Sequence, residues 1–190
     1  AAGFDPERTA ALDAVVTVSN PYTNAHRCNN RVRAVADLAL EILAEHNAQG
    51  LLVGTPAVSD ALTQGTPASG FSLISRDLIA DCVELAHNTH HGNAMLMISG
   101  CDKVGAAALM PLARTNAFGM VIYPGTSSPG SVSIKPWSDK SKNLTIMDWA
   151  EAKAASEAGR ISAVELVEIE SAVMPGSGTC GAMFTANTMS

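Results

Sequence analysis

Short apolar runs alternate with longer amphipathic segments along the chain. Four runs rich in β-branched or other apolar residues predict β-strands, at residues 14–19, 51–53, 94–99 and 119–123. Five segments with apolar residues three or four positions apart predict helices, at residues 31–46, 75–87, 104–116, 146–158 and 162–171. Strands that alternate with helices indicate an α/β fold, in which a parallel β-sheet is flanked by helices.

Local signals refine these elements. The runs AMLMIS at 94–99 and GMVIY at 119–123 are apolar throughout, which is typical of strands buried on both faces. Ser75 is the expected N-cap of its helix, and a further helix is expected to start at Ala182. Residues 58–70 and 125–143 are rich in Gly, Ser, Thr or Pro and predict loops, the second longer than most connections.

Composition narrows the class of protein. The chain has 190 residues, of which 47% are hydrophobic and 16% charged, and this excludes intrinsic disorder. A net charge of −6 without a basic stripe argues against a nucleic-acid partner. The apolar runs are too short to span a bilayer, and the N-terminus has no signal-peptide pattern. We therefore expect a soluble protein without a membrane partner, in the cytoplasm or in an organelle matrix after removal of a targeting peptide.

The chain contains four cysteines, and three of them occupy similar places. Cys28, Cys101 and Cys180 each lie in a loop that leads into a predicted helix, whereas Cys82 lies within a helix on its apolar face. No CxxC pair is present, and the ordinary role of a lone cysteine is that of a small buried hydrophobic residue. However, sites in parallel α/β folds lie at the carboxyl ends of strands, and helix N-termini favour thiolates. Three converging thiolates could hold an iron–sulfur cluster with one open iron position.

Five segments carry more specific motifs. In chain order they are Cys28-Asn29, VSDALTQGT at 58–66, SRDLIAD at 75–81, SGCDK at 99–103 and GTCGAMFTANTM at 178–189. Together they resemble the signatures of the dihydroxy-acid dehydratase and phosphogluconate dehydratase family. The matches occur in the family's order and extend over roughly residues 15–190.

The resemblance implies a fold, a reaction and two metal sites. Family members are hydro-lyases that dehydrate 2,3-dihydroxy acids or sugar acids to 2-keto acids, and their N-terminal domain is α/β with a parallel sheet. By this resemblance, Cys28, Cys101 and Cys180 ligate a 2Fe-2S or 4Fe-4S cluster that acts as a Lewis acid. Asp60, Asp102 and a carbamylated Lys103 are expected to ligate Mg²⁺. Because a carbamate forms on a neutral amine, a lowered pKa of Lys103 is also expected.

The resemblance also implies a longer enzyme. We expect residues 1–190 to be a single iron–sulfur and Mg-binding α/β domain that ends before a C-terminal domain. The catalytic base is expected beyond Ser190, so these residues alone are expected to be inactive. The expected partners are a small hydroxy-acid substrate, the C-terminal domain and further copies of the chain in a dimer or tetramer. The alternative is a non-catalytic assembly or regulatory domain with the same fold.

Histidines and tryptophans suggest alternatives of lower specificity. His87, His90 and His91 have a spacing that could bind zinc, although solvated histidines at a helix C-terminus explain it better. His26, two residues before Cys28, either contacts the substrate or the cluster surroundings, or has no such role. Trp137 and Trp149 are expected to be packing anchors.

Overall fold

The computed structural model describes residues 7, 10–140, 144–181 and 185. The chain divides into two compact units, Ala1–Pro124 and Gly125–Ser190, and each unit is described by itself. The helix start predicted at Ala182 lies outside the described residues. In the part of the chain that is described, no helix is both long and apolar enough to cross a membrane.

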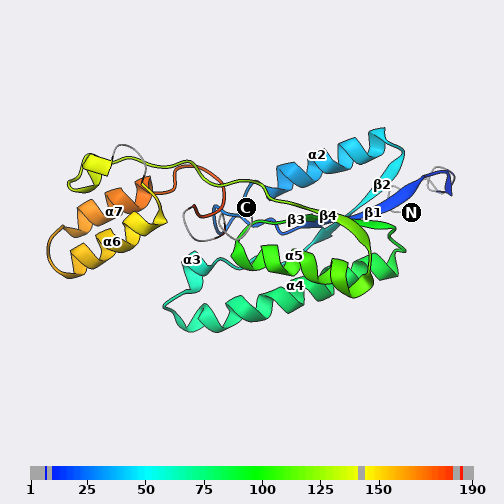
Figure 1. The fold of residues 1–190 in the computed structure, drawn as a ribbon, viewed down its shortest axis with the longest axis horizontal. Helices are drawn as coiled ribbons and strands as arrows, with labels where there is room; N and C mark the ends of the chain where they lie inside the picture. The colour runs from blue at the N-terminus through cyan, green and yellow to red at the C-terminus, as the bar shows by residue number, and fades with distance from the viewer. Residues whose placement is uncertain (1–6, 8–9, 141–143, 182–184, 186–190) are drawn as a thin grey trace. The chain divides into compact units, whose positions relative to one another are not determined.

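A four-stranded parallel sheet forms the centre of the first unit (Figure 1). Its strands are β1 (Ala14–Asn20), β2 (Ala48–Gly54), β3 (Ala94–Ile98) and β4 (Phe118–Ile122), in the order β2-β1-β3-β4. The register pairs Asn20 with Gly54 and Ile98 with Ile122, so the carboxyl ends of the strands lie at one edge of the sheet. The predicted α/β fold with a parallel sheet is therefore confirmed.

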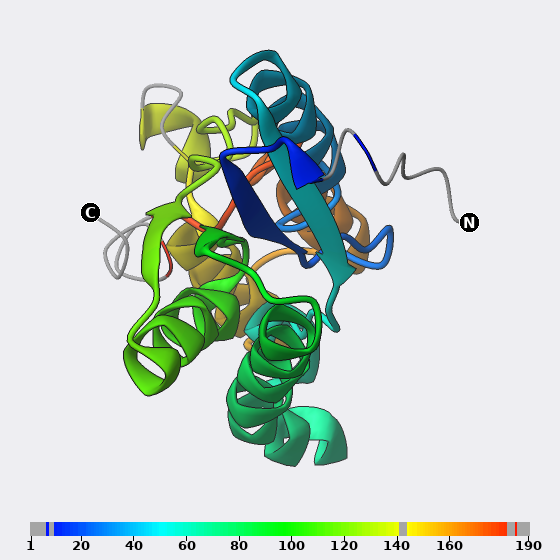
Figure 2. The ribbon, with the colours of Figure 1, turned by 90° about the vertical axis from the view of Figure 1, so that its right-hand side faces the viewer.

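Helices cover the two faces of this sheet unequally, as Figure 2 shows. α2 (Val32–Glu45) covers one face, where Val18 of β1 packs against Val32 and Ala36. α4 (Gly70–Thr89) and α5 (Asp102–Thr115) lie on the opposite face, where buried side chains of α4, β3 and α5 form a second cluster. Burial of these apolar side chains on both sides of the sheet is the main source of its stability.

The predicted loop at 58–70 contains regular structure. It forms a one-turn helix, α3 (Asp60–Thr63), and a 3-10 turn, η1 (Pro67–Ser69). α4 then begins at Gly70, so the prediction that Ser75 caps its N-terminus is wrong. The Ser75 hydroxyl instead donates to the carbonyl oxygen of Ser72 at 2.6 Å, a bond that serines make within helices.

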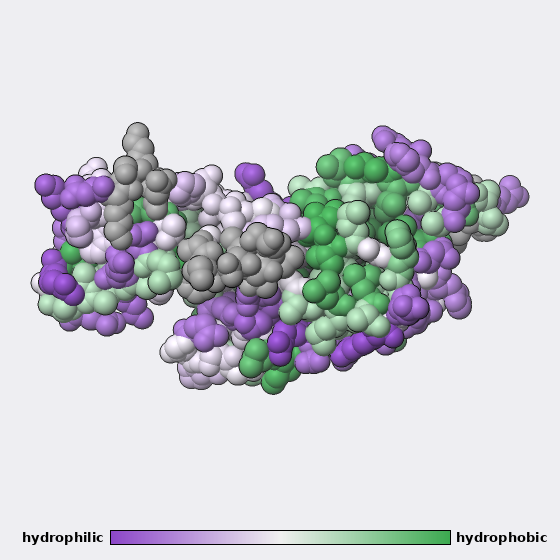
Figure 3. Space-filling model, in the orientation of Figure 1, coloured by the Kyte–Doolittle hydropathy of each residue, from purple (hydrophilic) through white to green (hydrophobic). Residues whose placement is uncertain are grey.

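β4 differs from the prediction in its burial. The sequence predicted a strand buried on both faces, but Phe118 is 85% and Met120 63% exposed. β4 is an edge strand. α5 covers only one of its faces, the face on which a Cβ added at Gly119 would meet the side chain of Leu112. Figure 3 shows apolar residues gathered on the surface around β4 and α2. The prediction is therefore wrong for β4, because one of its faces is uncovered within this unit.

The second unit is a small helical cluster. It contains η2 (Trp137–Lys140), α6 (Ile146–Glu157) and α7 (Ala163–Ala172). Capping boxes begin both α-helices, with Thr145 and Asp148 on α6 and Ser162 and Glu165 on α7. Its core includes Trp137, and Trp149 packs against that core, so the expectation of packing anchors is confirmed.

Candidate metal centre

Two of the three candidate cysteines come together at the carboxyl edge of the sheet. Cys28 lies in the loop between β1 and α2, and Cys101 lies between β3 and α5, at the N-cap of α5. Their exposed fractions are 5% and 2%. The hydrogen bond with the Cys28 thiol, together with burial, raises the pKa of Cys101. Two buried thiols in contact are suited to a soft metal, which takes up sulfur as protons leave.

Ser59 connects this thiol pair to a neighbouring group of charges. Its hydroxyl lies 3.6 Å from the sulfur of Cys101, and its side chain is buried. The hydroxyl bond works to lower the pKa of Cys101, against the larger effects of Cys28 and burial. Ser59 directly precedes Asp60, so one short segment contacts the thiol pair and supplies the first carboxylate of the charged group.

Asp60, Asp102 and Lys103 form that charged group. Asp60 is the first residue of α3, and Asp102 and Lys103 lie in the first turn of α5. The Lys103 ammonium donates to Asp102 Oδ2 at 2.7 Å and to Asp60 Oδ2 at 2.8 Å. The Ser72 hydroxyl donates to the other oxygen of Asp60. The structure therefore brings together the three residues that the resemblance assigned to Mg²⁺.

The electrostatics of this group differ from one expectation. Burial works to lower the pKa of Lys103, but its bonds to Asp102 and Asp60 outweigh burial, so the pKa is raised. The expected lowering of the Lys103 pKa is therefore wrong for this arrangement, because two carboxylates stabilise the ammonium. Burial works to raise the pKa of Asp60, but bonds from Lys103 and Ser72 outweigh it, and the pKa is lowered. Carboxylate oxygens held in this way suit a hard cation such as Mg²⁺.

Cys180 lies in the second unit, and its convergence with Cys28 and Cys101 stays a prediction. It is buried and follows Thr179, whose backbone bonds to Ser127 and Gly125 at 3.0 and 3.1 Å. Gly178 has a φ of 138° and packs against the backbone of Thr126 and Ser127, where a Cβ would overlap. The glycine before Thr179 thus permits a close approach that positions Cys180 within its unit.

The other candidates take different places. Cys82 lies half-buried within α4. His87 is buried, with Nδ1 3.0 Å from the Thr17 hydroxyl, so the expectation of a solvated histidine is wrong at this position. Among the residues that the structure describes, no three His, Cys, Asp or Glu side chains are grouped closely enough to hold a metal ion. The thiol pair and the carboxylate pair are therefore partial ligand sets.

Sequence reasoning missed several buried polar atoms at the carboxyl edge of the sheet. They follow or end three strands: Asn20 ends β1, Thr55 follows β2 and Ser99 follows β3. Their side-chain oxygens are buried without a hydrogen-bond partner among the described residues. Burial lowers the pKa of His26, although the Ala57 backbone works to raise it. Polar atoms in this state favour a polar ligand at the edge of the sheet.

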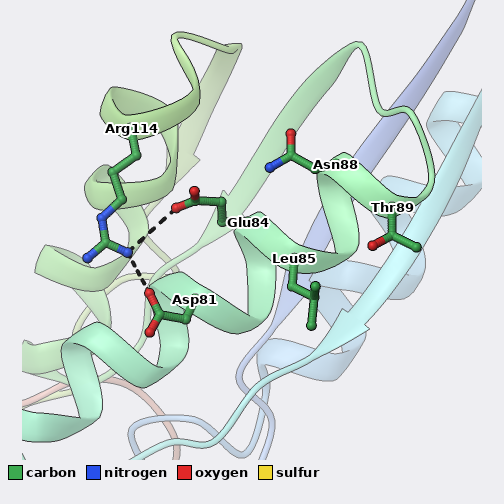
Figure 4. A pocket seen from close by; sticks show the side chains of 6 residues that line it. All are labelled: Asp81, Glu84, Leu85, Asn88, Thr89 and Arg114. Atoms are coloured by element: carbon green, nitrogen blue, oxygen red, sulfur yellow. Dashed lines mark hydrogen bonds and ion pairs between the residues drawn. The ribbon is translucent and has the colours of Figure 1, made fainter.

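A pocket of about 460 Å³ lies elsewhere, between α4 and α5 (Figure 4). Arg114 is its centre and donates to Asp81 at 2.6 Å, with Glu84 3.6 Å away. Arg114 is partly exposed and also pairs with Asp77, so its single positive charge is shared among three carboxylates. The pocket contains none of the candidate metal ligands, so we do not assign the chemistry to it.

Comparisons with known proteins agree with the motifs. A sequence model described as dihydroxy-acid/6-phosphogluconate dehydratase N-terminal matches residues 13–190. The chain is 38% identical over 176 residues to dihydroxy-acid dehydratase 3 of Bordetella bronchiseptica, and 40% and 38% identical to the dihydroxy-acid dehydratases of Polynucleobacter asymbioticus and Ralstonia nicotianae. Each match covers 93% of this chain and 30% of the relative. The chain therefore belongs to the dihydroxy-acid/6-phosphogluconate dehydratase N-terminal family.

Proposed function

We propose that this chain is the metal-binding part of a dehydratase that converts a 2,3-dihydroxy acid or a sugar acid into a 2-keto acid. The observation that carries the proposal is the buried pair of Cys28 and Cys101 thiols beside the carboxylates of Asp60 and Asp102. Soft and hard ligand sets connected by Ser59 suit two different metals. The relatives named dihydroxy-acid dehydratase support the choice of reaction.

The chain's own residues have separate tasks in this proposal. Cys28, Cys101 and Cys180 hold a 2Fe-2S or 4Fe-4S cluster, and Asp60, Asp102 and a carbamylated Lys103 hold Mg²⁺. When bound, these groups supply Lewis acids that polarise oxygen atoms of the substrate. Ser72 orients Asp60 through a hydrogen bond, and burial of the two thiols keeps water away from the sulfur ligands.

The rest of the activity is proposed for the whole protein. The chain spans about 30% of the length of the curated relatives that it matches. We infer that the catalytic base lies beyond Ser190 and that the whole protein is a dimer or tetramer. The cytoplasmic or organelle-matrix location also stays a proposal.

The test is turnover by the full protein, reconstituted anaerobically with iron, sulfide and Mg²⁺. A branched-chain 2,3-dihydroxy acid, an aldonic acid and 6-phosphogluconate are offered separately, and the 2-keto acid is measured. Asp102→Asn is expected to lower kcat by about 10²–10³-fold, the typical cost of one preorganised electrostatic contact. The control is Asp139→Asn, which changes an exposed carboxylate in the second unit. Absence of turnover on all three acids would favour the non-catalytic alternative.

A further inference from the structure

Asn29 joins the loops that carry the two neighbouring cysteines. It directly follows Cys28, and its side chain is fully buried. Its Oδ1 accepts a hydrogen bond from the backbone N–H of Cys101 at 2.9 Å, and its Nδ2 donates to the carbonyl oxygen of Pro21 at 2.7 Å. A side chain adjacent to one cysteine therefore holds the backbone of the other cysteine.

Gly100 makes this contact possible. It directly precedes Cys101, and a Cβ at this position would overlap the side-chain amide of Asn29. The loop between β3 and α5 therefore approaches Asn29 more closely than any residue with a side chain would allow. The contact therefore depends on two residues. Asn29, next to Cys28, supplies the amide, and Gly100, next to Cys101, leaves the space that the amide occupies.

We infer that Asn29 is a positioning residue that sets the separation of the Cys28 and Cys101 sulfurs. The inference rests on the proposed function, in which Cys28 and Cys101 are ligands of one cluster. The Asn29 contact would then hold these two ligands at a fixed distance. Both polar atoms of Asn29 bond to backbone groups, so its amide acts through the cysteines and does not itself bind a metal.

The chemistry of the amide makes asparagine difficult to replace. An amide both accepts and donates, as the Cys101 N–H and the Pro21 carbonyl require. An aspartate accepts from Cys101 but cannot donate to Pro21. An alanine leaves both buried backbone groups without this partner, which is costly for a buried group. Residues that orient metal ligands typically change metal affinity by about 10–100-fold when they are replaced.

The test measures the cysteine pair directly in the metal-free full protein. The oxidant diamide takes two electrons and two protons from a pair of thiols, which then form a disulfide. Formation of the Cys28–Cys101 disulfide is followed by mass spectrometry after peptide digestion. Burial of both thiols and the raised pKa of Cys101 slow the first attack on diamide, but the adjacent thiol then closes the disulfide, so the unchanged protein is expected to give the Cys28–Cys101 disulfide and little adduct of a single thiol. Asn29→Ala is expected to slow this step at least about tenfold, and to weaken iron binding within the range for such residues.

Three further variants make the result specific. Asn30→Ala changes an exposed asparagine one residue away and is expected to cross-link like the unchanged protein. Gly100→Ala is expected to slow cross-linking because the new methyl group displaces the Asn29 amide. When Asn29→Ala is already present, Gly100→Ala is expected to add little, since the shortened side chain leaves room for the methyl group.

A merely structural role predicts another pattern. It would lower thermal stability in Asn29→Ala while leaving the cross-linking rate unchanged well below the melting temperature, and that result would overturn the inference. If Asn29→Ala does not fold, the cross-linking rates of Gly100→Ala and Asn29→Asp test the inference instead. Unchanged rates in both variants would overturn the inference. If cross-linking depends on Asn29 but the reconstituted protein binds no iron, the positioning role stands and the proposed function fails.

Discussion

Replacement of Lys103 by methionine tests the charged group most informatively. The Lys103 ammonium is held by Asp102 at 2.7 Å and by Asp60 at 2.8 Å. Methionine keeps a side chain of similar length and removes the charge. The variant therefore leaves two carboxylates facing each other without the cation that holds them together, which destabilises the fold until another cation binds there.

The magnitude follows from the distances and the exposure of the three side chains. Each ion pair has a gross attraction of about 6 kcal/mol at an effective dielectric constant near 20, most of which desolvation offsets. The side chains of Lys103, Asp60 and Asp102 are 18%, 26% and 29% exposed. They thus lie between exposed pairs, worth about 0–1 kcal/mol, and fully buried pairs, whose disruption costs about 3–5 kcal/mol. We expect a loss of about 2 kcal/mol, which corresponds to roughly 4–8 °C in Tm for a unit of 190 residues and to a smaller shift for the longer full protein.

The assay is thermal unfolding of the full protein with and without Mg²⁺ at constant ionic strength. A ligand at about 100 times its Kd adds about 2.7 kcal/mol, so Mg²⁺ bound by the freed carboxylates is expected to restore the Tm of Lys103→Met. In the absence of bicarbonate, Mg²⁺ is expected to raise the Tm of the unchanged protein less, because Lys103 that is not carbamylated keeps its ammonium, which bonds to the same carboxylate oxygens. Lys135→Met, at an exposed lysine of the second unit, serves as control. An unchanged Tm for Lys103→Met without a Mg²⁺ response would refute the reasoning.

Three further predictions concern other parts of the chain. Burial lowers the pKa of His87, so acidification below about pH 6.5 protonates the unfolded state first and reduces the free energy of unfolding. His87→Asn, measured by urea unfolding at pH 7 and pH 5, is expected to reduce that loss, and an unchanged pH dependence would show that His87 is not its source. Gly130→Ala places a Cβ against the backbone carbonyl of Ala172 and is expected to cost about 1–3 kcal/mol in chemical unfolding, whereas Gly70→Ala, at a φ of −62° in open space, is the control expected to be neutral or stabilising. Ser59→Ala removes a hydroxyl from the Cys101 sulfur and is expected to lower the reduction potential of the reconstituted cluster in a redox titration; an equal potential in Ser59→Ala and the unchanged protein would show that this bond has no effect on the cluster.

The order of elements along the chain was predictable because local periodicity determines it. The strand at 14–19 and the helix at 31–46 are present as β1 (Ala14–Asn20) and α2 (Val32–Glu45). The exposure of β4 was not predictable, because it depends on which strand lies at the edge of the sheet. An apolar run such as GMVIY is compatible both with a central strand and with an edge strand that has one face uncovered by helices, so the pattern does not distinguish the two.

The site was predictable only in part, for a similar reason. Placement of Cys28 and Cys101 at strand ends follows from the alternation of strands and helices, and the structure brings these two together. The raised pKa of Lys103 depends on Asp60, 43 residues away in the sequence. The contact of Asn29 with the Cys101 backbone likewise depends on the paths of two loops. Such contacts are set by tertiary packing, which periodicity and spacing do not reveal.

The central claim is that three specific cysteines hold an iron–sulfur cluster, and metal analysis tests it most directly. Iron and acid-labile sulfide are measured in the full protein, purified anaerobically and reconstituted, with each cysteine replaced by alanine in turn. The account predicts that the unchanged protein and Cys82→Ala contain both elements, whereas Cys28→Ala, Cys101→Ala and Cys180→Ala lose most of them. Full retention of iron and sulfide in any of those three variants, or their absence from the unchanged protein, would contradict the account.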